Sequence, residues 1–140
     1  GNAFAPLSEI LGSIPHEKSG EKIPGSDHTI WEVAEHIRLC LYDLVEYSKD
    51  SYFQSPPWPD GYWPNHSAPA SGKEWLETVE RIEQLIEEMI ELIQDPEKDL
   101  FEPFSSNPEH NLLRQATIVA EHNAYHSGQL AMMKKALKDG

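Results

Sequence analysis

Apolar residues recur at three- and four-residue steps in three long stretches of the chain, the spacing of one helical face. These stretches predict long α-helices over residues 29–50, 73–94 and 107–138. Asp27 or Thr29 can cap the first helix, and Asp95-Pro96 stops the second. Asn107-Pro108 offers the third a capping residue followed by proline at the first helical position.

The segments between the predicted helices are rich in proline and glycine. Residues 1–27 leave room for one short helix, around Leu7 to Leu11. Residues 51–72 hold five of the eleven prolines, and these predict a long loop. Its aromatic residues are too many for a solvated linker: Tyr52, Phe53, Trp58, Tyr62 and Trp63. The loop is expected to be either a flap over the end of the bundle or a wall of a pocket.

These elements predict an all-α fold in a single domain over residues 1–140. No segment alternates apolar and polar residues as a strand would, and three long helices with one short piece indicate a helical bundle. A bundle usually has four long helices, so the N-terminal helix is expected to be short or missing in this chain.

The net charge of the chain argues against some classes of binding partner. The 140-residue chain has 24 acidic and 11 basic residues, a formal net charge of -13. So acidic a surface repels nucleic acid and anionic lipid, and neither is expected as a partner. The one basic cluster is Lys134, Lys135 and Lys138, near the end of a helix, where cations are favoured. With no membrane-length apolar run and a lone cysteine, Cys40, a cytoplasmic protein is expected.

Two histidines carry the strongest chemical signal. His122 and His126 lie four residues apart, on or beside the apolar stripe of the last helix, so their imidazoles can converge on one ion. Two hydrogen-bonded core histidines would give the same spacing. His36, beside the stripe of the first long helix, is the best third ligand. Three imidazoles leave one position open on a divalent metal, as in catalytic sites, and suit zinc, nickel, iron or copper.

Residues next to the three histidines are expected to support the site or to lie on the surface. Asn123 and Gln129 are candidates for holding the histidine pair in place. Glu35 and Glu121 each precede a histidine and project about 100° away from it, which predicts surface positions. Cys40 has no cation on its own helical face and is not expected to be a nucleophile.

The histidine segments resemble those of the DinB-like (DinB/YfiT) metal-binding proteins. His28-Thr29-Ile30-Trp31-Glu32, followed by His36, is similar to one conserved block of that family, and residues 122–130 (HNAYHSGQL) are similar to its closing motif. The resemblance extends loosely from Gly1 to Lys135. It implies a four-helix bundle, often dimeric, with one divalent metal ion on His36, His122 and His126. In that family a first long helix begins upstream of the segment that matches residues 4–14, so the chain is truncated or a partner fills that place.

The resemblance also implies activities. Relatives include thiol S-transferases and a thiol-dependent isomerase, while others are described only as metal-dependent hydrolases. We therefore expect an enzyme in which the metal activates a low-molecular-weight thiol that attacks a small electrophile. The alternatives are a hydrolase that uses metal-activated water and a non-catalytic module that binds a metal or a ligand.

Overall fold

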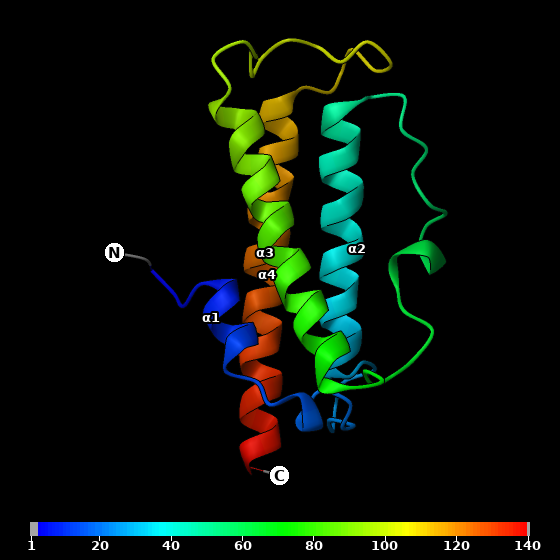
Figure 1. Cartoon of the computed structure of the whole chain (residues 1–140), viewed down its shortest axis with the longest axis vertical. Helices are drawn as coiled ribbons and strands as arrows, with labels where there is room; N and C mark the ends of the chain where they lie inside the picture. The colour runs from blue at the N-terminus through cyan, green and yellow to red at the C-terminus, as the bar shows by residue number, and fades with distance from the viewer. Residues whose placement is uncertain (1–2, 140) are drawn as a thin grey trace.

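A computed structural model describes residues 3–139 of the chain (Figure 1). The described part is all-helical, as predicted. Its elements are α1 (Leu7–Gly12), the 3-10 turn η1 (His16–Lys18), α2 (Ile30–Lys49), the 3-10 turn η2 (Asp60–Tyr62), α3 (Gly72–Gln94) and α4 (Leu112–Asp139). Three long helices form the bundle, and α1, six residues long, lies beside α4 (Figure 1). The expected short N-terminal helix is confirmed.

The long loop determines the direction of the helices. Residues 50–71 leave the upper end of α2 and run back down its outer side, so that α2 and α3 point the same way and α4 runs opposite to them (Figure 1). The loop therefore lies along the side of the bundle. The interpretation as a flap over its end is wrong, and the interpretation as a side wall fits the path.

Apolar side chains from all three long helices fill the centre of the bundle. α2 contributes Ile37 and Leu41, α3 contributes Ile82 and Leu85, and α4 contributes Leu130, each with 0% of its surface exposed. Burying side chains of this size supplies about 1.5–3 kcal/mol each and is the main force that holds the helices together.

The ends of the helices show where the sequence prediction was right and where it was wrong. Thr29 caps α2 in a reciprocal capping box with Glu32, and α3 ends at Gln94 as expected. The third long helix does not begin at Asn107-Pro108. The Asn107 side chain instead accepts the N–H of Glu109 within a closed turn, and Asn111 caps α4 by accepting the N–H of Arg114 at 2.8 Å. Asn107 therefore does cap a turn, as its type predicts, but this turn precedes α4, which begins only at Leu112.

Glu35 is buried, which corrects its expected surface position. Its carboxylate accepts the Thr78 hydroxyl of α3 at 2.6 Å and the Arg38 Nε–H at 2.9 Å. A buried carboxylate needs such partners because losing hydration is costly. The contact with Thr78 therefore joins α2 to α3 one residue before His36. Glu121 is exposed, as predicted.

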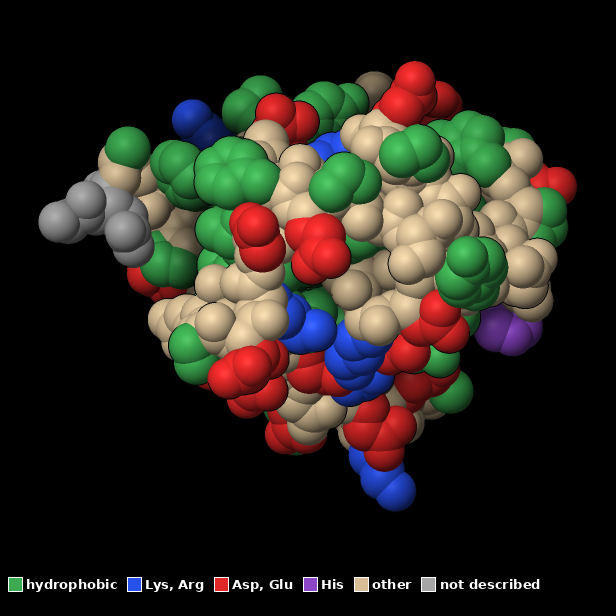
Figure 2. Space-filling model, turned by 90° about the horizontal axis from the view of Figure 1, so that it is seen from above, with side chains coloured by type: hydrophobic (Ala, Val, Ile, Leu, Met, Phe, Trp, Pro, Cys, Tyr) green, Lys and Arg blue, Asp and Glu red, His purple; other side chains and the backbone are tan. Residues whose placement is uncertain are grey.

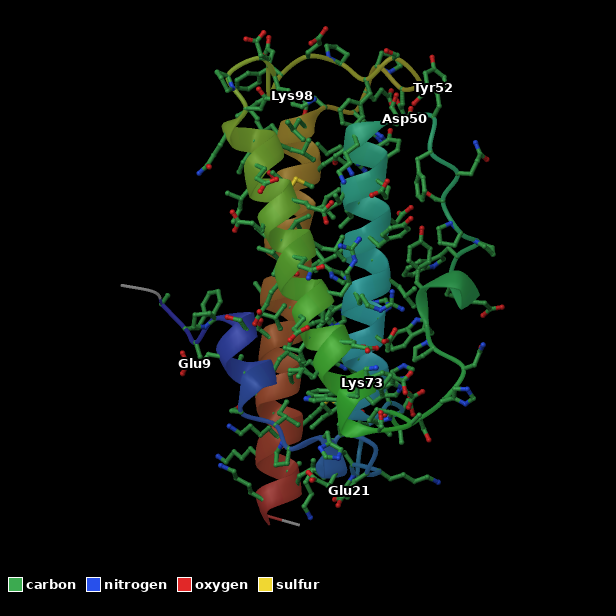
Figure 3. The ribbon with its side chains drawn as sticks, in the orientation of Figure 1. Glu9, Glu21, Asp50, Tyr52, Lys73 and Lys98 are labelled. Atoms are coloured by element: carbon green, nitrogen blue, oxygen red, sulfur yellow. The ribbon has the colours of Figure 1, made fainter. Side chains whose placement is uncertain are left out.

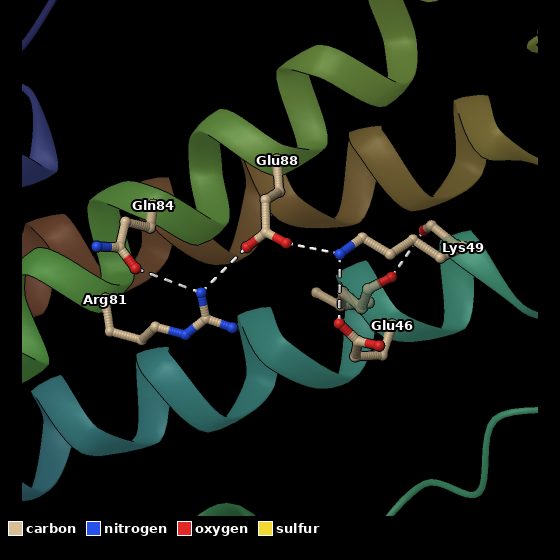
Figure 4. A network of polar contacts seen from close by, with 7 residues as sticks. Glu46, Lys49, Arg81, Gln84 and Glu88 are labelled. Carbon is tan, nitrogen blue, oxygen red and sulfur yellow. Dashed lines mark hydrogen bonds and ion pairs between the residues drawn. The ribbon is translucent and has the colours of Figure 1, made fainter.

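One ion pair joins the outer faces of α2 and α3, and a second within α3 shares its carboxylate (Figure 4). Glu88 lies between Lys49, whose Nζ is 2.6 Å away, and Arg81, whose guanidinium is 3.1 Å away. The pKa of Glu88 is lowered, first by its hydrogen bond from Lys49. Because these side chains are partly solvated, the network contributes little to stability and serves mainly to align the two helices.

The surface agrees with the acidic composition. Seen from above, acidic and hydrophobic side chains intermingle on the end of the bundle, with a smaller group of Lys and Arg among them (Figure 2). Among the helices of residues 3–139, none has both the length and the apolar character that crossing a membrane requires.

Candidate metal centre

Two helices and the long loop bring the candidate ligands together. His36 lies in the second turn of α2, and His122 and His126 lie one turn apart in the middle of α4. The ring centroids of His36 and His126 are 4.9 Å apart, and those of His36 and His122 are 5.3 Å apart. The Nε2 atoms of His122 and His126 are separated by 3.1 Å. The three predicted histidines therefore form one cluster.

Carbonyl oxygens set the orientation of two of the rings. The Nδ1–H of His36 donates to the backbone carbonyl of Tyr62 at 2.8 Å, and the Nδ1–H of His126 donates to the Gln129 Oε1 at 2.7 Å. A carbonyl can only accept, so in the neutral rings the hydrogen sits on Nδ1 and Nε2 carries a free lone pair. Histidines that bind metals are usually held in this way. This donor set fits a divalent ion.

Cys40 is the fourth potential ligand near the cluster. Ligand atoms of His36, Cys40 and His122 lie within 4.8 Å of one another, and this group could hold a metal ion; it includes Cys40 in place of the predicted His126. The sulfur, however, is 3.7 Å from both ring nitrogens of His36. A sulfur that shared an ion bound at Nε2 would lie closer to Nε2 than to Nδ1. The thiol therefore packs against the His36 ring and does not share an ion bound at Nε2. Burial raises the pKa of the Cys40 thiol to about 12.

The aromatic loop covers the cluster. Trp63 stacks on His36 with ring centroids 4.0 Å apart and on His28 with ring centroids 3.9 Å apart. Tyr62, 8% exposed, donates its hydroxyl to the Asp43 carboxylate at 3.0 Å, which anchors the loop to α2. Residues 62 and 63 thus form a wall over His36. The residue His122 is half-buried, whereas His36 and His126 are buried.

The histidines are held in their neutral form. Burial is the first cause of a lowered pKa at His36, His122 and His126, and the neighbouring rings lower the pKa of His36 and His122 further. The pKa of His122 falls to about 4. Neutral imidazole is the form that ligates metals, so protons compete weakly for this cluster near neutral pH.

A family model described as the DinB superfamily matches residues 3–130 of the chain. The chain belongs to this superfamily. Comparison with curated proteins and with solved structures gives no match. Membership in the superfamily and the buried cluster together fit a metal-binding family, and the match spans both histidine segments.

In this DinB superfamily member, the two residues expected to support the histidines behave differently. Gln129 makes the contact with His126 described above. Asn123 makes no hydrogen bond to the rings, and its buried Oδ1 has no partner among the described residues. Sequence reasoning placed Tyr62 and Trp63 in the aromatic loop but did not connect them to His36. The density of aromatic residues was the only signal, since a backbone carbonyl contact leaves no mark in residue type.

Substituting Gln129 tests the supporting contact. Gln129→Ala should weaken metal binding by about 10–100-fold, because the His126 ring loses the oxygen that fixes its tautomer. Gln129→Glu keeps an acceptor and should restore most of the affinity. Asn123→Ala, on the same helix, is the matched control and should bind metal like the wild type. Equal affinities for Gln129→Ala and Asn123→Ala, in a competition titration with a chromogenic chelator, would contradict this role.

The lowered pKa of His122 predicts a dependence of stability on pH in the metal-free protein. The unfolded chain takes up a proton near pH 6.5, whereas the folded chain does so only near 4. Stability is therefore full above about pH 6.5 and falls as the pH drops toward 4. This ring alone should cost about 2 kcal/mol between pH 7 and pH 5. Urea unfolding with chelator present should show a smaller loss for His122→Gln; an identical loss would contradict the assignment.

Proposed function

We propose that this DinB superfamily member is a metal-dependent enzyme, with one divalent ion held by the Nε2 atoms of His36, His122 and His126. The supporting observation is the pair of carbonyl contacts that leave Nε2 free on His36 and His126. The Nε2 atoms of His122 and His126 lie 3.1 Å apart, which is the spacing of a hydrogen bond from His122 in the metal-free protein and is close enough for both atoms to share a cation. An ion would accept a lone pair from all three rings, with a coordination position left for a substrate.

We propose a thiol as the substrate that takes this position. A bound divalent ion would supply the positive charge that favours the deprotonated form of a thiol or of water. A thiol ionises with a pKa near 8.5, against 15.7 for bulk water. The site therefore has to lower the pKa of a thiol by much less than that of water to deprotonate it at neutral pH. Within residues 3–139, no carboxylate lies within 4.0 Å of the three rings to act as a base. Glu35 accepts a hydrogen bond from Thr78, and Asp43 accepts one from Tyr62 through Oδ2, while its buried Oδ1 has no partner among the described residues.

The reaction is a transfer of the thiol sulfur to an electrophilic carbon. The thiol proton passes to solvent, a sulfur–carbon bond forms, and the leaving group departs with its bonding electron pair. The chain's own groups orient the rings, through Tyr62 and Gln129, and exclude water from one side, through the stacked Trp63. In this proposal substrates approach from the side of His122, the one residue of the three that is only half-buried.

The test compares thiol transfer with hydrolysis in protein of measured metal content. Zinc, nickel and iron forms are assayed with glutathione, cysteine or mercaptoethanol and a chlorinated aromatic electrophile, and separately with nitrophenyl esters. We expect thiol-dependent release of chloride that is lost in His126→Gln and kept in His66→Gln, an exposed loop histidine. Ester hydrolysis without thiol turnover would favour the hydrolase, and stoichiometric metal with neither activity would favour the non-catalytic module.

A further inference from the structure

A cavity lies on the side of α4 that faces away from the candidate metal centre. It has a volume of about 640 Å³ and is bounded by α1 with the segment before it and by the C-terminal half of α4. Ala124 and Gly128, which line it, follow His122 and His126 by two residues each, about 200° around the helix. The cavity is thus separate from the candidate metal centre. Its volume lies within the range of pockets that bind small molecules.

The floor of this cavity is apolar. Ile10 from α1 and Ala124 and Ala131 from α4 face it, and Phe4, which is 62% exposed, stands at its edge. An exposed phenylalanine beside a concave apolar surface is a feature that a ligand with a hydrocarbon body would cover.

Gly128 is the unusual residue in the floor. It lies well inside a 28-residue helix, where glycine costs about 1 kcal/mol relative to alanine. A Cβ atom built at this position meets no other atom within 4 Å, so no contact inside the described chain requires a glycine. Because glycine has no side chain, the cavity between α1 and α4 is wider at Gly128.

Cations gather at one end of the same cavity. Lys134, Lys135 and Lys138 line it, in a chain whose net charge is -13. Lys134 donates to the Ser13 hydroxyl at 2.7 Å, which turns its ammonium across the cavity toward the end of α1. Within the described side chains, no carboxylate lies within 4.0 Å of these three ammonium groups. The helix dipole explains Lys138 in the last turn, but it does not explain Lys134 and Lys135 farther in.

One acidic group also lines the cavity. Glu9 projects from α1, on the same side of the molecule as the N-terminal segment (Figure 3). It lies one residue before Ile10 in α1, whereas the lysines occupy the last turns of α4. From Ala124 to Lys134 the helix rises about 15 Å, so an apolar end and a cationic end are separated by the length of a medium hydrocarbon chain.

We propose that this cavity binds a small amphipathic anion. The hydrocarbon body lies over Ile10, Ala124 and Ala131, and a carboxylate or phosphate head lies among Lys134, Lys135 and Lys138. The overall acidic surface repels anions, so the lysine cluster supplies the local attraction that a single anionic head needs. The site is independent of the metal centre, and its failure would leave the proposed function untouched.

The test measures binding of defined probes by isothermal titration calorimetry. Decanoate and decyl phosphate carry the proposed body with two kinds of head, decanol lacks the charge, and butyrate lacks the body. We expect one decanoate or decyl phosphate per chain, with decanol and butyrate bound at least tenfold more weakly. The stronger of the two anions identifies the head. Binding of decanol equal to that of decanoate, or no binding of either anion at millimolar concentration, would overturn the proposal.

Variants locate the site. Gly128→Leu fills the floor and should abolish binding of decanoate, whereas Gly128→Ala should weaken it less; both substitutions favour the helix, and thermal unfolding checks that the fold persists. Lys134→Gln combined with Lys135→Gln and Lys138→Gln should reduce binding at least tenfold, and Lys98→Gln should not. Unchanged binding in Gly128→Leu would place the ligand elsewhere. Sedimentation that shows a wild-type dimer converted to a monomer by Gly128→Leu would assign the cavity to a second copy instead.

Discussion

His126→Ala should lose at least about 100-fold in metal affinity, and the activity with it. The substitution removes one of three ligands, a larger change than the loss of a contact outside the ligands, which costs 10–100-fold. His126 is 6% exposed, so alanine also leaves a small void and strands the Gln129 oxygen that the ring satisfies. We expect metal-free His126→Ala to be destabilised by about 1–3 kcal/mol, measured by urea unfolding with chelator present.

His126→Gln separates ligation from packing. Glutamine fills most of the space and keeps a polar group, but it binds metals far more weakly than imidazole. It should therefore lose metal like alanine while retaining more of the stability. His66→Gln, in the exposed part of the loop, controls for the loss of any histidine. If both His126 variants keep stoichiometric metal, His126 is a hydrogen-bonded core residue and the proposed ligand set is wrong.

Leu130→Ala should lose stability but keep its metal affinity, which is the opposite of the result expected for His126→Gln. Leu130 is fully buried one turn after His126, and truncating such a side chain costs about 2–5 kcal/mol. Its apolar side chain is neither a ligand nor a hydrogen-bond partner of one, so the folded variant should bind metal within about threefold of the wild type, well short of the 10–100-fold cost of losing a supporting contact. Equilibrium unfolding and a metal titration at low temperature give the two values. A loss of metal affinity as large as in His126→Ala would show that packing, and not ligation, controls the site.

The helices and the histidine cluster could be predicted because both follow from residue spacing. Three- and four-residue steps of apolar residues place α2 and α3 within about one residue of their observed ends. The four-residue spacing of His122 and His126 fixes their proximity as soon as α4 forms. His36 could be chosen only as the best of several histidines, and the packing of α2 against α4 brings it to the pair.

The features that sequence reasoning missed depend on contacts between distant segments. Asn107-Pro108 carries a valid capping signal, yet hydrogen bonds within the turn delay the start of α4 until Leu112. Glu35 was expected on the surface from its angle to His36, but the same angle points it at Thr78 of α3. The contacts of Tyr62 and Trp63 with His36 depend on the path of a loop, which helical spacing does not specify.

The central claim is that His36, His122 and His126 share one ion and that Cys40 does not. Extended X-ray absorption fine structure at the zinc edge, on protein loaded with one equivalent of zinc, measures the ligands directly. We expect only nitrogen or oxygen neighbours at about 2.0–2.1 Å, with the outer scattering of three imidazoles, and an unchanged spectrum in Cys40→Ala. A sulfur neighbour at about 2.3 Å that disappears in Cys40→Ala, or fewer than three imidazoles, would contradict the claim.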